Sequence, residues 1–242
     1  MRKDLRPYWV KKIYLRFRHC YTEYFLRPEF ATLGDHHTFM QPWHTLISGP
    51  NIHMGNAATI VAEPDNKVRI GVWGREPNLG SIHIGDAVMI SPGVRISASD
   101  EVRIGHGCML ANGVYITDCD WHGIYDRMQR DPTPKPVRIG DNVWVGDHAT
   151  VLKGVSIGNN SIVAAGSMVT KNVPPNVIVA GNPARPVKNL DDAQAFYTRT
   201  QYFADPQKLA QEIDAIDKMV LTGNSFWFWL ASLLFRNRRA YS

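Results

Sequence analysis

The chain is poor in cysteine and has no long apolar run. Its three cysteines, Cys20, Cys108 and Cys119, are an odd number without the spacing of a metal or redox motif. We therefore expect no disulfide framework and a reducing, cytoplasmic setting. No apolar stretch reaches the roughly 20 residues that span a bilayer, and the N-terminus lacks the continuous apolar core of a signal peptide. The sequence thus predicts neither a transmembrane helix nor a cleaved leader.

Positive charge is concentrated at the start of the chain. The formal net charge is +5, and residues 1–30 hold eight Lys/Arg against three acidic residues, a surplus equal to that of the whole protein. The same segment contains eight aromatic residues. This composition predicts either a helix that packs on the rest of the protein or on a sister subunit, or contact with a membrane surface. We expect no nucleic-acid partner, because no recognised nucleic-acid-binding fold presents the segment.

An aliphatic residue recurs every six positions in the stretch from Ile139 to Val173. Neither a helix nor a simple strand has this period, whereas a solenoid does, because each repeat buries its apolar side by stacking on its neighbours. Three six-residue units make one coil, so residues eighteen apart are expected to lie about 4.8 Å apart on one face. The repeating positions are Ile139, Val145, Val151, Ile157, Val163 and Val169.

The six-residue repeat sets the predicted boundaries. It begins near Asn51, stops after Ile116, restarts at Ile139 and ends at the two prolines after Val173. We therefore predict a basic, aromatic extension over 1–50, a solenoid domain over 51–189 with a projecting loop at 117–138, and helices over 190–242. In the last segment, Asp205 and Pro206 have the pattern of a helix N-cap and first residue. The apolar tail from Phe226 to Phe235 predicts either a capping helix or a helix in a bilayer interface.

The interruption at 117–138 contains the residues best suited to acid–base chemistry. His122 lies there within four residues of two carboxylates, Asp118 and Asp120. A carboxylate that accepts the proton of one ring nitrogen leaves the other nitrogen as a base near neutral pH. The pattern predicts His122 as a catalytic base and leaves open which carboxylate orients it.

Four motifs run through the repeat and the segment after it. They are Ile139-Gly-Asp-Asn-Val-Trp-Val-Gly146, Ile157-Gly-Asn-Asn-Ser161, Ala165-Gly-Ser-Met-Val-Thr-Lys-Asn-Val-Pro-Pro175 and Ala180-Gly-Asn-Pro-Ala-Arg185. Over roughly residues 84–189 the chain resembles the hexapeptide-repeat acyltransferases, in the branch of galactoside, maltose, xenobiotic and polysaccharide O-acetyltransferases. The resemblance implies a mainly β fold, a left-handed parallel β-helix, here with helical extensions at both ends. It also implies a homotrimer with active sites between subunits and acetyl-CoA or another acyl-CoA as donor.

The resemblance assigns roles to several residues. His122 matches the loop histidine that acts as general base in the family. Trp144 matches a tryptophan that lines the CoA channel. Asp147 and Ala165 match positions whose backbones bind the pantetheine arm, although the family more often has Ser or Gly where this chain has Asp147. The resemblance thus implies a CoA site along the outside of the solenoid.

Basic residues complete the expected CoA site. Lys171 and Arg185 match the residues that hold the CoA phosphates in the family. Lys153 stands eighteen residues before Lys171, one coil away, so an anion or solvent must separate the two ammonium groups. We therefore include Lys153 in the expected phosphate site, with two lysines splayed into solvent as the alternative. No metal is expected at this site.

These observations favour an acyl-CoA-dependent O-acyltransferase, most simply one that acetylates a hydroxyl of a sugar or membrane-linked glycan. Transfer of a longer acyl chain to a lysophospholipid or other lipid is the alternative within this class. The γ-class carbonic anhydrases share the scaffold, and Ile104-Gly-His-Gly-Cys108 is similar to their metal segment, but Ala111 stands where they have a second histidine. A non-catalytic trimeric scaffold is a further alternative. We expect a cytoplasmic protein that can sit peripherally on the inner face of the membrane.

Overall fold

The computed structural model describes residues 4–74, 76, 79–129, 133–191 and 193–234. The chain divides into two compact units. One, Tyr21–Ala204, contains every strand of the described residues, and the other, Met1–Cys20 with Asp205–Ser242, is helical where it is described. No helix in the described part of the chain is both long enough and apolar enough to cross a bilayer.

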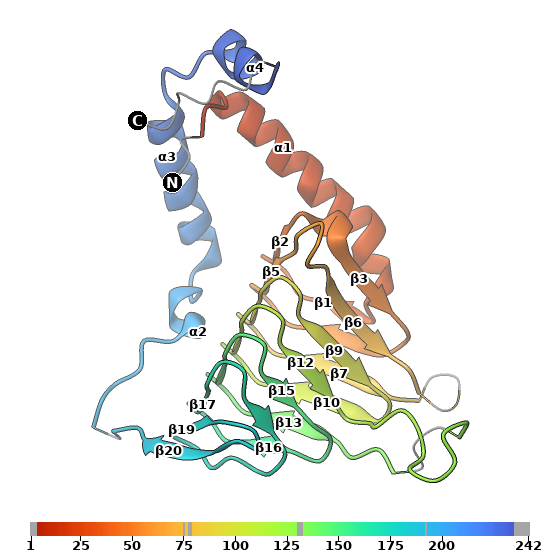
Figure 1. The fold of residues 1–242 in the computed structure, drawn as a ribbon. Coiled ribbons are helices and arrows are strands. Elements are labelled where there is room, and N and C mark those ends of the chain that lie inside the picture. Colours follow the sequence, from red (N-terminus) through yellow and green to blue (C-terminus); the bar gives the residue numbers. More distant parts are fainter. Residues whose placement is uncertain (1–3, 75, 77–78, 130–132, 192, 235–242) are drawn as a thin grey trace. The chain divides into compact units, whose positions relative to one another are not determined.

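The strands form three sheets, here called A, B and C, and from β1 to β18 successive strands enter the three sheets in turn (Figure 1). Sheet A contains β1 (Thr32–Leu33), β4 (Ile52–Met54), β7 (Ser81–Ile84), β10 (Glu101–Ile104), β13 (Val137–Ile139) and β16 (Ser156–Ile157). Sheet B contains β2 (Thr38–Met40), β5 (Thr59–Val61), β8 (Met89–Ile90), β11 (Met109–Leu110), β14 (Trp144–Val145), β17 (Ile162–Val163), β19 (Val177–Ala180) and β20 (Arg185–Asn189). Sheet C contains β3 (Thr45–Ser48), β6 (Val68–Val72), β9 (Arg95–Ala98), β12 (Tyr115–Thr117), β15 (Thr150–Val151) and β18 (Met168–Val169). Pairing is parallel except between β19 and β20.

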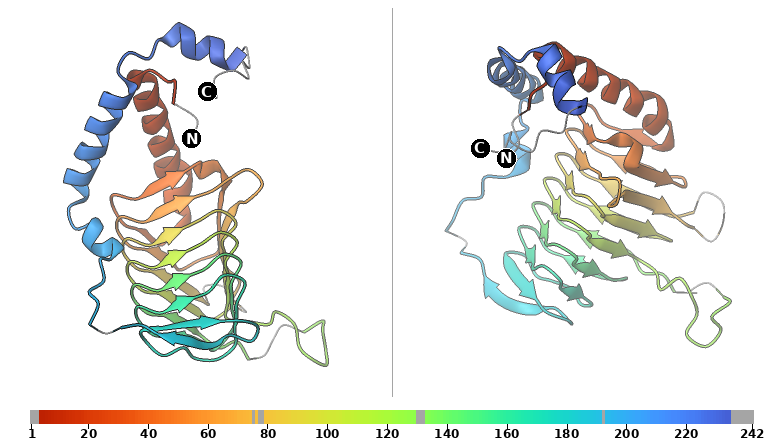
Figure 2. Two further views of the ribbon diagram at one scale, coloured as in Figure 1. Left: turned by 60° about the vertical axis from the view of Figure 1, so that its left-hand side comes forward. Right: turned by 45° about the horizontal axis from the view of Figure 1, so that its top comes forward.

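The strand register confirms the predicted eighteen-residue stacking. Ile139 pairs with Ile157 in sheet A, Val145 with Val163 in sheet B, and Val151 with Val169 in sheet C. These side chains are buried inside the coil, and the turns stack as successive rungs (Figure 2). Like residues therefore meet one above another, which is why a six-residue apolar period is enough to specify the coil.

The coil begins before the predicted boundary at residue 51, and its strands continue past Val173, where the repeat was predicted to end. Its first turn is formed by β1, β2 and β3, with the short helix η3 (Pro42–His44) before β3, inside the segment that we assigned to the N-terminal extension. Leu33, Phe39 and Thr45 are buried in this turn at six-residue spacing. At the other end, β19 continues sheet B after the two prolines, and β20 covers it from the antiparallel side.

One corner of the coil is held by a ladder of side-chain acceptors. Oδ1 of Asp86 accepts the backbone N–H of Asn56 at 2.6 Å, and Nδ1 of His106 accepts that of Asp86 at 3.0 Å. Oδ1 of Asp141 accepts the N–H of His106 at 2.7 Å. Each coil thereby satisfies a turn N–H of the coil before it, because a turn of this kind leaves that donor outside the strand hydrogen bonds.

The segment after β20 returns to the coil. There α2 (Arg199–Tyr202) begins with a capping box made by Thr198 and Gln201. The guanidinium of Arg199 donates to the carbonyl of Ala87 at 2.8 Å and to Oγ1 of Thr59 at 3.0 Å. Both acceptors border or lie in sheet B, so α2 is tied to that face.

The helical unit consists of α1 (Tyr8–Tyr21), α3 (Pro206–Leu221) and α4 (Phe226–Leu234). After α1 the chain continues as η1 (Thr22–Leu26) and η2 (Arg27–Glu29). The predicted start of α3 is confirmed: the side chain of Asp205 accepts the N–H of Lys208, and Pro206 is the first helical residue. Gly223 follows the helix with φ +84°, a conformation that glycine adopts without a steric penalty.

Candidate active site

The excursion over 117–138 leaves the coil at the corner between sheets C and A. It connects β12 to β13, and its described residues project beside the coil (Figure 2). Residues 130–132 of this predicted loop lie outside the described residues. In the next two coils the same corner carries Lys153, between β15 and β16, and Lys171, which follows β18. The corner therefore brings the candidate base and two basic residues to one side of the coil.

His122 is exposed on the excursion, with one ring nitrogen engaged. Nδ1 lies 2.8 Å from the carbonyl oxygen of Arg127. Because a carbonyl can only accept, Nδ1 carries the proton and donates it, so Nε2 is the basic nitrogen. A tight turn holds this arrangement: the N–H of Gly123 donates to the carbonyl of Gln129 at 2.9 Å. His122 thus has the tautomer that a general base requires.

Asp118 is buried at the base of the excursion and holds backbone rather than His122. Its Oδ1 accepts the N–H of Ser99 and its Oδ2 that of Asp100, each at 2.7 Å. Burial raises the pKa of Asp118 above its ordinary value, and the backbone N–H donors act in the opposite direction. The carboxylate therefore anchors the loop to the end of β9.

Asp120 is also engaged away from His122. Its Oδ2 lies 2.7 Å from Nζ of Lys153, and the same ammonium donates to the carbonyl of Thr133 at 3.2 Å. The main-chain carbonyl of Arg127 lies at Nδ1 of His122, and orientation of His122 by Asp118 or Asp120 stays a prediction. No sequence pattern indicates a main-chain partner of this kind, since every residue has a carbonyl.

The expected pantetheine positions stack as predicted. Asp147 and Ala165 are exposed at the corner between sheets B and C, and the N–H of Gly166 donates to the carbonyl of Asp147 at 2.7 Å. Trp144 lies on sheet B just before this corner, with 46% of its surface exposed. These three residues form a continuous outer strip of the coil, and their contact with CoA stays a proposal.

The three basic residues are not equivalent. Lys171 is exposed at the corner between sheets C and A, and Arg185 is exposed in β20, where its Nη1 donates to the carbonyl of Ala184 at 2.9 Å. Lys153 is only 20% exposed and is paired with Asp120. A carboxylate of the protein thus lies beside Lys153, and a contact between Lys153 and a CoA phosphate stays a prediction.

The segment that is similar to the carbonic anhydrase metal site has structural roles. Nδ1 of His106 accepts the N–H of Asp86, and the thiol of Cys108 donates to the carbonyl of Gly140 at 3.0 Å. Burial raises the pKa of the Cys108 thiol to about 12, so the thiolate that metals require is strongly disfavoured. His106 and Cys108 therefore each make a hydrogen bond that holds neighbouring coils together.

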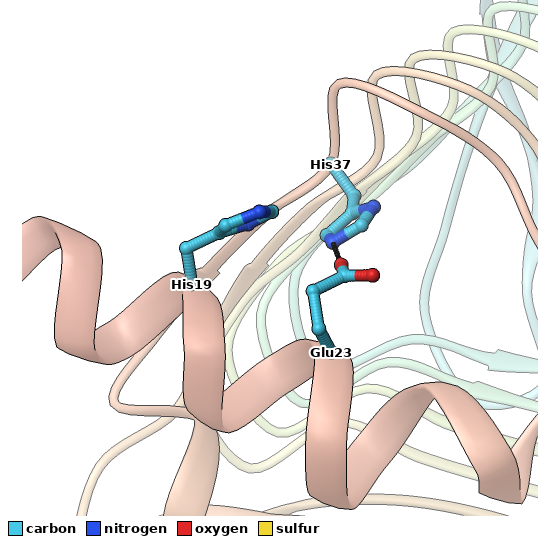
Figure 3. Close-up of side chains that lie close together, drawn as sticks. All are labelled: His19, Glu23 and His37. Atoms are coloured by element: carbon cyan, nitrogen blue, oxygen red, sulfur yellow. Dashed lines mark ion pairs between the residues drawn. The ribbon is translucent and has the colours of Figure 1, made fainter.

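A histidine–carboxylate pair lies in the first turns of the strand unit. Oε1 of Glu23 in η1 is 3.0 Å from Nε2 of His37, and Nδ1 of His37 is 2.8 Å from the carbonyl of Gly34 (Figure 3). The pair joins η1 to the turn before β2, three coils before the excursion. It has no part in the candidate active site, and the expectation of a metal-free active site stays a prediction.

Two family models match the coil. "Bacterial transferase hexapeptide (six repeats)" matches residues 136–171, and "Hexapeptide repeat of succinyl-transferase" matches residues 102–118. Two solved structures are also similar. The polySia specific acetyltransferase NeuO is 25% identical, over 78% of this chain and 99% of that chain, with a TM-score of 0.38. A maltose O-acetyltransferase from Clostridium difficile 630 is 26% identical, over 76% and 86%, with a TM-score of 0.40.

Curated relatives match over longer stretches than the family models do. Galactoside O-acetyltransferase of Escherichia coli (strain K12) is 29% identical over 191 residues, 76% of this chain and 73% of that protein. The putative lipopolysaccharide biosynthesis O-acetyl transferase WbbJ of the same strain is 35% identical over 135 residues, 51% of this chain and 66% of that protein. Hexapeptide models match two separate parts of the coil, and O-acetyltransferases align with much of it, so the chain is similar to the hexapeptide-repeat acyltransferases.

Proposed function

We propose that this protein transfers an acetyl group from acetyl-CoA to a hydroxyl of a sugar, with His122 as general base. The observation that carries the proposal is the donation from His122 Nδ1 to the Arg127 carbonyl, which leaves Nε2 basic on an exposed loop. The relatives named above support the substrate class, because their names describe galactoside, maltose, polysialic acid and lipopolysaccharide acetylation. None of these four is a lipid acyltransferase, so we do not carry the lysophospholipid alternative further.

The reaction follows from this tautomer. Nε2 of His122 takes the proton of the acceptor hydroxyl as its oxygen attacks the thioester carbonyl of acetyl-CoA. The tetrahedral intermediate collapses with cleavage of the carbon–sulfur bond, and the imidazolium returns the proton to the departing CoA thiolate. Nδ1–H remains on the Arg127 carbonyl throughout and keeps the ring oriented. A positioned base of this type typically contributes ~10²–10⁴-fold to the rate.

The assembly and the donor site belong to the same proposal. We take the coil to be a left-handed parallel β-helix that forms a homotrimer, with each active site shared between neighbouring subunits. Acetyl-CoA would lie along the strip of Trp144, Asp147 and Ala165, with its phosphates near Lys171 and Arg185. The exposure of all five residues supports this placement. A membrane-linked glycan on the cytoplasmic side is the acceptor that best suits the apolar helical unit.

The test compares His122→Ala with the wild type and with His44→Ala as matched control, since His44 belongs to η3 in the first turn of the coil. We expect His122→Ala to lower kcat by ~10²–10⁴-fold and to leave the Kd for acetyl-CoA nearly unchanged. His44→Ala should keep the wild-type kcat and the wild-type Kd for acetyl-CoA. Acetylated products are detected by mass spectrometry across a panel of sugar and lipid acceptors. Equal loss of turnover and of acetyl-CoA binding in His122→Ala would contradict its role as base.

A further inference from the structure

The net positive charge of this protein is located in its helical unit. Met1–Cys20 and Asp205–Ser242 hold twelve Lys/Arg against five Asp/Glu, a surplus of seven. The strand unit, Tyr21–Ala204, holds fifteen against seventeen, a deficit of two. The unit with the candidate active site is thus slightly acidic, and the helical unit is strongly basic. A charge separation of this kind directs the helical unit toward anionic partners.

α1 contacts α3 through a polar face. The hydroxyl of Tyr8 donates to Asp214 at 2.8 Å, and Lys12 pairs with the same carboxylate at 2.7 Å. Lys11 pairs with Asp217 at 2.7 Å. These contacts use hydrogen bonds and ion pairs where two packed helices normally bury apolar side chains.

The apolar stripe of α1 lies on another side of the helix. Trp9, Ile13 and Phe17 follow at intervals of four, and 52%, 60% and 57% of their surfaces are exposed. At about 100° per residue, this stripe points away from the face formed by Tyr8, Lys11 and Lys12. Within the helical unit Trp9 stacks on Phe226 of α4, with 5.5 Å between the ring centroids, and about half or more of each stripe side chain still remains exposed.

The two C-terminal helices, α3 and α4, also carry exposed apolar side chains. On α3, Ile213, Ile216 and Val220 are 48%, 55% and 56% exposed, whereas Leu221 at the end of the helix is buried. On α4, Trp227 and Phe228 are 74% and 62% exposed. Large exposed apolar patches are rare on monomeric soluble proteins and mark surfaces that bind a partner or a membrane.

We propose that this helical unit docks on the surface of an anionic bilayer, with the α1 stripe Trp9, Ile13 and Phe17 in the interfacial layer. Tryptophan and phenylalanine suit that layer, and basic side chains beside them attract acidic lipid head groups. A second copy of the chain is disfavoured as the partner, because two units with a surplus of seven positive charges repel each other. The proposal goes beyond acetyl transfer and does not depend on it.

The test uses the full chain and sedimentation with vesicles of phosphatidylcholine, with and without about 30% phosphatidylglycerol as the acidic lipid. We expect the protein to bind acidic vesicles at least about tenfold more tightly than neutral ones. High salt should weaken the binding to acidic vesicles. The variant Trp9→Ser/Ile13→Ser/Phe17→Ser should lose at least about tenfold of the acidic-vesicle binding. Circular dichroism checks that the helices of this variant persist.

The matched control is Leu46→Ser/Leu79→Ser, which changes two exposed leucines of the strand unit and should bind vesicles as the wild type does. Light scattering reports the oligomeric state of each variant. Unchanged vesicle binding by the α1 variant would overturn the proposal. A second outcome would also overturn it: the wild type does not bind acidic vesicles, and the α1 variant is monomeric where the wild type is an oligomer. The stripe would then be an interface between copies of the chain.

Discussion

Lys153 and Asp120 form an ion pair that ties the excursion to the following coil, with Nζ 2.7 Å from Oδ2. The same ammonium donates to the carbonyl of Thr133, on the other limb of the excursion. Lys153 therefore holds the two limbs together near the point where they leave the coil. Because His122 lies between these limbs in the sequence, we expect Lys153 to position the proposed base.

Replacing Lys153 should slow turnover without weakening the donor complex. We expect Lys153→Ala to lower kcat by about tenfold, because a small displacement of His122 is costly for proton transfer, and to leave the Kd for acetyl-CoA nearly unchanged. Lys153→Arg should restore much of kcat, since a guanidinium also reaches a carboxylate. Steady-state kinetics and calorimetry measure both quantities. Acetyl-3′-dephospho-CoA provides the control: if Lys153→Ala removed the preference for the phosphorylated donor, Lys153 would be a phosphate ligand after all.

A methyl group at Gly123 should disturb the turn that orients His122. A Cβ at this position would lie 2.5 Å from the carbonyl oxygen of Asp126, which is far inside van der Waals contact. We expect Gly123→Ala to lower kcat by about tenfold or more while Tm changes little, because the turn lies outside the core. Thermal unfolding and initial rates are measured on one preparation. Wild-type turnover would show that the turn need not keep this geometry.

Asn160 joins three coils and should contribute clearly to stability. Its side chain accepts from Asn142 at 3.0 Å and donates to Asn176 at 2.9 Å, and its φ is +62°. Asn160→Ala should lower the free energy of unfolding by about 2–3 kcal/mol, from two hydrogen bonds and a left-handed backbone. Asn160→Gly should lose up to about 1 kcal/mol less, because glycine tolerates this φ. Denaturant titration compares them, and equal losses would show that the backbone conformation is not strained.

The Cys108 thiol should resist ionisation in the folded protein. Its pKa is raised to about 12, first of all by burial. The unfolded thiol ionises near pH 8.5, so the folded state binds the extra proton between these values and loses stability as the pH rises. Relative to Cys108→Ala, the wild type should lose about 1.4 kcal/mol per pH unit between roughly pH 9 and 11. Denaturant titrations of both proteins at several pH values measure this difference. If the free energies of unfolding of the two proteins changed equally with pH, the thiol would not be buried.

Thiol labelling gives an independent check of the same burial. At pH 8 iodoacetamide should modify exposed Cys20 and spare buried Cys108 and Cys119 in the native protein. All three should react in denaturant. Rapid native labelling of Cys108 would contradict the packed interior of the coil.

Local sequence was sufficient to predict the coil but not its first turn. Val145 and Val163 could be placed one above the other because the eighteen-residue rule depends only on spacing. Leu33, Phe39 and Thr45 have the same six-residue spacing, but three positions among polar neighbours are too few to identify a turn. After Val173, two prolines suggested an end, yet Val177 and Val179 remain buried and continue sheet B. Proline lacks a backbone donor only at its own position, so pairing resumes two residues later.

The amino-acid sequence alone determined that a six-residue apolar period builds a stacked coil, that an excursion interrupts it, and that His122 lies there shortly after two carboxylates. These are properties of spacing and residue type. Only the tertiary structure decided that Asp118 anchors backbone, that Asp120 pairs with Lys153, and that the Arg127 carbonyl orients the histidine. Each carboxylate is drawn to the donors that folding brings within reach, and those donors lie one coil away in space but 18 to 33 residues away in sequence.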